Sequence, residues 1–170
     1  LICQAEHTGD NTVILATDSP ELARATTEAL PAQVARLQRA ELIRQSLADF
    51  GLVAICANLQ DAAQLCNEVA PEHLQLMVRE PLALLEQIQA AGAVFLGPLA
   101  TVPLGDYAAG PSHVLPTGGS ARFTSGLTVR DFLVSSSLLY ATERGFARLA
   151  PDVELLAHAE GLDAHAAAVS

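Results

Sequence analysis

Short apolar runs alternate with longer amphipathic segments along the first hundred or so residues of the chain. Four of the runs are rich in aliphatic residues and predict strands: Thr12–Thr17, Leu52–Ala57, Leu74–Val78 and Ala93–Leu96. The runs are apolar without alternation, so we expect the strands to be buried on both faces, as in parallel sheets. Strands that alternate with helices predict an α/β fold with a mostly parallel sheet flanked by helices.

Helix start and stop signals lie between these runs. Ser19 followed by Pro20 is typical of an N-cap and a first helical residue, and Pro31 predicts a break or kink farther along. Asn58 is a second expected N-cap, and Pro71 ends the segment that follows it. The predicted helices cover residues 20–37, 39–49 (ended by Gly51), 59–69 and 81–90.

The pattern changes after the fourth run. Residues 97–119 are rich in glycine and proline and predict a long irregular loop, and loops of this length are usually functional. In parallel sheets such loops gather ligands at the carboxyl ends of the strands. Helices are then expected over residues 129–140, 143–150, 153–159 and 162–169. We therefore expect an α/β domain over 1–120 and a helical tail over 121–170.

Composition narrows the possible functions. Hydrophobic residues make up 51% of the 170 residues, charged residues 16%, and the net charge is −10. This balance indicates a well-filled core and argues against nucleic-acid binding or a basic membrane anchor. The three cysteines form no CxxC pattern and indicate buried thiols in a reducing compartment. The first residue is Leu1, and we expect the chain to be a piece of a longer polypeptide.

Polar residues that could carry chemistry are few and clustered. All histidines except His158 lie beside carboxylates or amides, in groups that fall at the ends of predicted elements. Nitrogen and oxygen donors of this kind suit a divalent transition metal, although each pair alone could equally be a solvated surface group. The candidate groups are Gln4 with His7, Glu72 with His73, Asp106 with His113, and Glu160 with His165.

The pair Glu72 and His73 places a demand on the backbone. Neighbouring residues of an extended segment point in opposite directions, so these two share one proton path only if the chain bends there. Pro71 is positioned to help set such a bend. From the residues alone, the sequence suggests a metal-assisted enzyme about as strongly as it suggests a domain with polar surface groups.

Four segments resemble the histidinol dehydrogenase family, in order and at similar separations: QAEH, APEHLQLMV, GAVFLGP…LGDYAAGPSHVLPTGGSARFTSGLTVRDF and AEGLDAHAAAV. The resemblance covers essentially the whole chain and corresponds to the C-terminal part of the family sequence. It implies an incomplete Rossmann-like sheet. It also implies a cytoplasmic enzyme of histidine biosynthesis that oxidises L-histidinol to L-histidine through histidinal with zinc and NAD.

The resemblance also implies a role for each candidate residue. Zinc ligands would be Gln4, His7, Asp106 and His165, with one zinc ion per subunit. His73 would take the hydroxyl proton, and Glu72 would activate water for the second oxidation. His113 and Glu160, together with the zinc ligands and the Glu72–His73 pair, would bind the substrate. In the family's homodimer, the residues at the positions of Glu160 and His165 cross the interface on a swapped tail.

The chain departs from the family pattern at several positions. Val102 stands where the family usually has a glutamate near the substrate, Ser112 replaces an asparagine, and Val134-Ser135 replace a Lys-Arg pair. The family's NAD contacts lie mostly outside the matched part, so we expect the 170 residues alone to bind NAD poorly. Two alternatives stay open: a related dehydrogenase for another small alcohol, and a non-catalytic dimerisation or metal-binding remnant.

Overall fold

The computed structural model describes residues 1–170 and divides into two compact units, Leu1–Asp131 and Phe132–Ser170. The division follows Asp131, whereas the sequence pattern placed its boundary after residue 120. The assignment of two domains stays a prediction, and each unit is described by itself below.

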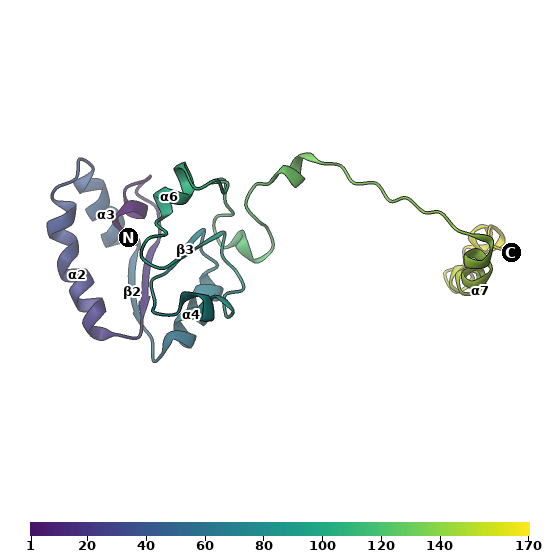
Figure 1. The fold of residues 1–170 in the computed structure, drawn as a ribbon, viewed down its shortest axis with the longest axis horizontal. Coiled ribbons are helices and arrows are strands. Elements are labelled where there is room, and N and C mark those ends of the chain that lie inside the picture. The colour runs from purple at the N-terminus through teal and green to yellow at the C-terminus, as the bar shows by residue number, and fades with distance from the viewer. The chain divides into compact units, whose positions relative to one another are not determined.

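The first unit contains two pairs of parallel strands (Figure 1). Strand β1 (Val13–Thr17) pairs with β2 (Gly51–Ile55), and β3 (His73–Leu76) pairs with β4 (Ala93–Leu96). All four strands were predicted to within a few residues. The α/β class with parallel strands flanked by helices is confirmed, although the strands form two separate pairs and not one sheet.

Two helices cross from β1 to β2, namely α2 (Pro20–Val34) and α3 (Ala40–Phe50). The Ser19 hydroxyl caps α2 as predicted and accepts a hydrogen bond of 3.1 Å from the Leu22 amide. The predicted break at Pro31 is wrong, because α2 continues through it to Val34. Val34 is buried in one cluster with Ile43 of α3. This packing offsets the backbone hydrogen bond that a proline removes.

Helix α4 (Leu59–Val69) has the predicted bounds, and the Asn58 side chain accepts a hydrogen bond of 2.8 Å from the Asp61 amide. Helix α5 (Pro81–Leu85) is shorter than expected. The Asn67 side chain explains the difference: it donates to the Gln87 carbonyl at 2.8 Å and accepts from the Gln89 amide at 2.7 Å. These bonds occupy backbone groups that a longer helix would have used.

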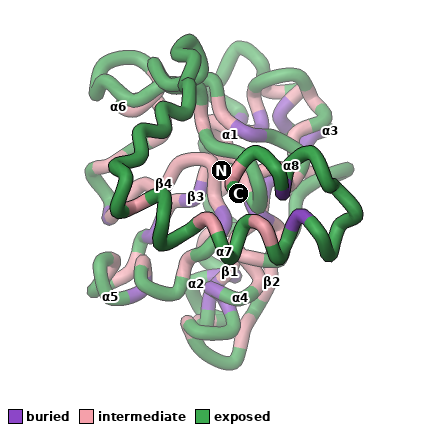
Figure 2. The backbone as a smooth tube through the Cα atoms, turned by 90° about the vertical axis from the view of Figure 1, so that its right-hand side faces the viewer, coloured by how far each residue is buried: buried purple, intermediate pink, exposed green.

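Two small aliphatic clusters form the core of the first unit. Figure 2 colours the buried parts of the backbone purple. The first cluster joins α1 (Ile2–Ala5), β1, α2 and α3 through Ala5, Val13, Val34 and Ile43. The second joins α4, β3 and α5 through Ala63, Leu74, Leu76 and Leu84. The predicted aliphatic core is present, but β2 contributes none of these buried residues, and its Leu52, Val53 and Ile55 are exposed.

The glycine-rich stretch 97–119 is not irregular throughout. It contains α6 (Val102–Tyr107), a short helix with Pro103 near its start, and is followed by the 3₁₀ turns Ser120–Arg122 and Val129–Phe132. The predicted helix over 129–140 is wrong, because residues 133–142 contain no helix or strand. Three consecutive serines, Ser135–Ser137, follow Val134, and both residue types are weak helix formers.

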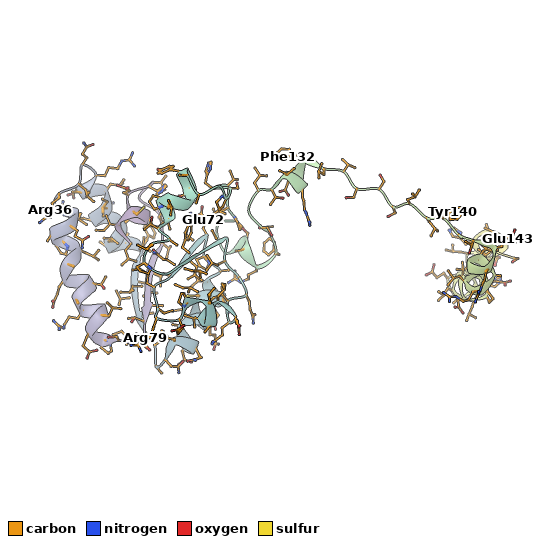
Figure 3. The ribbon with its side chains drawn as sticks, in the orientation of Figure 1. Arg36, Glu72, Arg79, Phe132, Tyr140 and Glu143 are labelled. Atoms are coloured by element: carbon orange, nitrogen blue, oxygen red, sulfur yellow. The ribbon has the colours of Figure 1, made fainter.

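The second unit contains α7 (Glu143–Ala159) and α8 (Asp163–Ala167), which follow residues 133–142. Phe132 and Tyr140 are labelled in Figure 3. Two helices were expected in place of α7, but Pro151 lies within one continuous helix. The Thr142 hydroxyl caps α7 by accepting from the Gly145 amide at 3.2 Å. No helix in the structure combines the length and the apolar character needed to cross a bilayer.

Replacing Asn58 by alanine removes the side-chain acceptor at the start of α4, the helix that packs on β3. We expect the free energy of unfolding to fall by about 1 kcal/mol. Asn58→Asp keeps an acceptor oxygen and should stay near the wild-type value. Urea unfolding of the three proteins measures the difference, and equal stability of Asn58→Ala and wild type would show that the cap contributes nothing.

Candidate active site

The N-terminal helix positions the first candidate pair. Ala5 is fully buried and ties α1 to the first cluster. Gln4 is half-buried, and its Nε2 atom is buried without a hydrogen-bond partner. His7 lies in the bend after α1 and is exposed, while its carbonyl accepts a hydrogen bond of 3.3 Å from Arg39 Nη1. The backbone at His7 is therefore held against the start of α3.

The second candidate pair lies at the start of β3. His73 is the first residue of that strand, and Glu72 occupies a bend immediately before it, labelled in Figure 3. The Glu72 carbonyl accepts a hydrogen bond of 2.8 Å from the Ala93 amide. A Cβ atom on Gly92 would lie 2.6 Å from that carbonyl oxygen, so glycine permits the close approach of the two segments. The bend that a shared proton path requires is present at Glu72.

The His73 imidazole and the Asp106 carboxylate lie side by side. His73 Nε2 is 3.6 Å from Asp106 Oδ1, and the side chains are only 12% and 22% exposed. Nε2 is buried and has no hydrogen-bond partner. The ring stacks on Phe95 of β4, with centroids 6.0 Å apart and an interplanar angle of 28°. A buried imidazole nitrogen that nothing satisfies is free to accept a proton or bind a ligand.

The Cys3 thiol on α1 is affected electrostatically by Asp106, one member of this pair. Burial raises the pKa of the Cys3 thiol, and the carboxylates of Glu6 and Asp106 raise it further, because both oppose a thiolate. The influence of Asp106 places α1 and α6 within electrostatic range of one another.

The remaining candidates lie on other elements. His113 is exposed in the segment after α6. Glu160 and His165 belong to the second unit, where Glu160 is the C-cap residue of α7 and His165 lies on α8, and both are exposed. His158, expected to be a surface residue, is exposed and lies 3.5 Å from Asp163.

Imidazole and carboxylate, the side-chain types of the His73–Asp106 pair, are common zinc ligands in proteins. No three His, Cys, Asp or Glu side chains of this chain lie close enough together to hold a metal. Three of the four expected ligands lie in the first unit: the amide Gln4, the imidazole His7 and the carboxylate Asp106. The fourth, His165, belongs to the second unit. The Asp106 carboxylate, half-buried beside the His73 imidazole, is of a type that binds zinc.

The position of this group differs from the expected carboxyl end of the strands. His73 begins β3, and α6 follows β4 and returns to the side of the sheet on which His73 lies. Sequence patterns did not indicate a role for Phe95 or Cys3. Phe95 lies within an apolar run that predicts a strand, and Cys3 was expected to be a buried thiol. Once His73 is paired with Ala93, the alternation of side chains along a strand places Phe95 on the same face as His73, and this could have indicated its role.

Parallel strands flanked by helices define an α/β protein, and a buried His–Asp pair of this kind is typical of an enzyme active site. Comparison with known proteins identifies the family. The family model described as "Histidinol dehydrogenase" matches residues 1–170. The chain therefore belongs to the histidinol dehydrogenase family.

Individual relatives agree. The chain is 48% identical over 169 residues to the histidinol dehydrogenases of Aquifex aeolicus and Moorella thermoacetica, covering 99% of this chain and 40% of each relative. The crystal structure of histidinol dehydrogenase from Elizabethkingia anophelis matches with a TM-score of 0.93 at 33% identity, over 99% of this chain and 39% of that one. The chain thus spans about two-fifths of the length of the curated relatives it matches.

The raised pKa of Cys3 gives a direct test of how close α1 and α6 lie. In a Cys56→Ser/Cys66→Ser background, we expect alkylation of Cys3 to accelerate only at a pH above that for a free thiol, because less thiolate is present at each pH. Asp106→Asn removes an opposing charge and should move the rate–pH profile to lower pH. Asp10→Asn serves as the control. Superimposable profiles for wild type and Asp106→Asn would contradict the placement of α6 near α1.

Proposed function

We propose that this chain forms the zinc- and substrate-binding part of an NAD-linked dehydrogenase that oxidises L-histidinol to L-histidine through histidinal. The observation that carries the proposal is the buried His73 imidazole, whose Nε2 has no partner and lies 3.6 Å from Asp106. Membership of the histidinol dehydrogenase family over the whole chain supports the same reaction. The enzyme would act in the cytoplasm, in the last steps of histidine biosynthesis.

Zinc would be held by Gln4, His7 and Asp106, with His165 of the partner subunit as the fourth ligand. Bound there, the ion would orient the imidazole and amino nitrogens of the substrate. Asp106 supports this assignment, since its carboxylate is half-buried beside an imidazole. Gln4 would bind through its side-chain carbonyl oxygen. His7 is exposed and would contribute from the bend after α1.

His73 would serve as the base of the first oxidation. Loss of hydride from an alcohol to NAD requires removal of the hydroxyl proton, and a neutral imidazole accepts a proton at neutral pH. The unpaired Nε2 atom is the acceptor in this role. Glu72 would then activate water for attack on the aldehyde, since its bend lets the carboxylate leave the line of β3.

Binding of the substrate would involve the second unit of a partner chain. His113 and the partner subunit's Glu160 would contact histidinol, together with the zinc ligands. Both residues are exposed in the single chain, as residues that await a ligand or a partner must be. The assembly is therefore a homodimer in this proposal, with each active site built from two chains.

Replacing His73 by asparagine keeps a polar side chain at the start of β3 but removes the proton acceptor. We expect kcat for histidinol oxidation to fall by about a hundredfold to ten-thousandfold, with a much smaller change in KM. NADH absorbance measures the rate, and bound zinc, measured by atomic absorption, should be unchanged. A variant that retains most of kcat would exclude His73 as the base.

Replacing Glu72 by glutamine should separate the two oxidations. The amide cannot take a proton from water, so histidinal should accumulate and the NADH formed per histidinol should approach half the wild-type yield. Mass spectrometry of the product distinguishes aldehyde from acid. Full conversion to histidine at the wild-type rate would remove Glu72 from the mechanism.

Val102 favours a second candidate, a family member that acts on another small alcohol. On α6 it lies one turn before Asp106 and thus on the same face of the helix. An apolar side chain at this position offers a cationic substrate no ion pair. If histidinol is the substrate, Val102→Glu should lower its KM or leave it unchanged. A wild-type kcat/KM that is higher for a different amino alcohol would instead identify that alcohol as the substrate.

A further inference from the structure

We propose that Phe95 is a positioning residue for His73: its ring holds the imidazole at the angle and distance at which Nε2 lies beside Asp106. The inference rests on the proposed role of His73 as the base. Phe95 would touch neither substrate nor cofactor, and its effect would pass entirely through the imidazole.

The pairing of β3 with β4 places the two rings together. His73 is the register partner of Ala93, and Phe95 lies two residues farther along β4, opposite Gln75. Residues two apart on a strand share a face, so Phe95 lies diagonally next to His73. The rings stack with centroids 6.0 Å apart and planes inclined by 28°.

No hydrogen bond in the structure fixes Nε2. The atom is buried and accepts or donates no hydrogen bond, and Asp106 Oδ1 at 3.6 Å lies beyond hydrogen-bond distance. A metal-binding or catalytic imidazole is commonly oriented by a hydrogen bond to its surroundings. Here the stacked phenyl ring is the contact that the structure provides for that purpose.

Phe95 also contacts the helix that carries Asp106. A Cβ atom on Gly105 would lie 2.6 Å from Phe95 Cε1 and 3.2 Å from Cζ, so α6 rests directly against the edge of the ring. Asp106 is the next residue. The same phenyl ring therefore contacts both the imidazole and the helix that carries the carboxylate.

Phe95 is not simply a member of the nearby core. Its neighbours Val94 and Leu96 pack against the cluster of Ala63, Leu74, Leu76 and Leu84, on the opposite face of β4. Phe95 is absent from that cluster and half-buried on the His73 side. The strand thus uses one face for stability and the other for the imidazole.

The test is a size exchange between Phe95 and Gly105, made in the protein as the cell produces it. Phe95→Leu removes the aromatic face, Gly105→Ala adds a methyl group that meets the ring, and the double variant restores the fit between strand and helix. Val94→Ala is the matched control on the other face of β4. Thermal unfolding, kcat and KM for histidinol are measured for each protein.

We expect Phe95→Leu to lower kcat by about tenfold to a hundredfold with KM little changed, because a misplaced base slows the chemical step. The double variant should regain the stability lost in Gly105→Ala but not the lost kcat. Val94→Ala should lower the melting temperature without lowering kcat. If the double variant regains kcat as well, or if Phe95→Leu keeps wild-type kcat, Phe95 only fills space and the proposal is overturned.

A second measurement does not depend on activity. A stacked phenyl ring shifts the His73 ring-proton resonances, so Phe95→Leu should displace these signals in NMR spectra, and Val94→Ala should leave them in place. Unchanged His73 signals in Phe95→Leu would refute the stack. If the wild-type protein does not oxidise histidinol, the proposed function fails, while the NMR comparison still decides whether Phe95 positions the imidazole.

Discussion

The parallel pairing of β3 with β4 is the constraint on which the candidate site depends. It sets His73 opposite Ala93 and brings Phe95 onto the same face. The following segment turns back as α6, so that Asp106 lies 3.6 Å from the imidazole. The bend at Glu72 and the missing side chain of Gly92 allow the two strands to meet at this end. Without this register, His73 and Asp106 would not be neighbours.

The elements of the first unit follow closely from local sequence signals. Ser19 and Asn58 cap the helices that they were expected to cap, and the four apolar runs form strands. The errors arise where longer-range contacts compete with local preference. Val34 packs in the first cluster, so α2 continues beyond Pro31. The Asn67 side chain forms hydrogen bonds with backbone groups of Gln87 and Gln89, and these groups would otherwise have extended α5.

The candidate site was less accessible from sequence. Spacing alone grouped Asp106 with His113, whereas the structure pairs Asp106 with His73, which lies on a different strand and far away in the sequence. A contact of this kind depends on strand register and on the return of α6, and no local pattern encodes either of them. The roles of Gln4, His7 and His165 came from resemblance to the family and stay predictions.

The chain matches only part of the length of its relatives. It spans about two-fifths of the length of its curated relatives. Within it, two small aliphatic clusters hold the strands in place. The apolar side chains of β2 stay exposed beside them. The two faces of β3 and β4 therefore differ: one face packs in the core, and the other face carries the imidazole.

The most direct test of this account is a crystal structure of the protein grown with zinc, with anomalous diffraction used to locate the ion. The account predicts a zinc peak bound by Gln4, His7 and Asp106, and a His73 ring stacked on Phe95 beside them. Zinc bound elsewhere, or an Asp106 side chain turned away from His73 and from the ion, would contradict it.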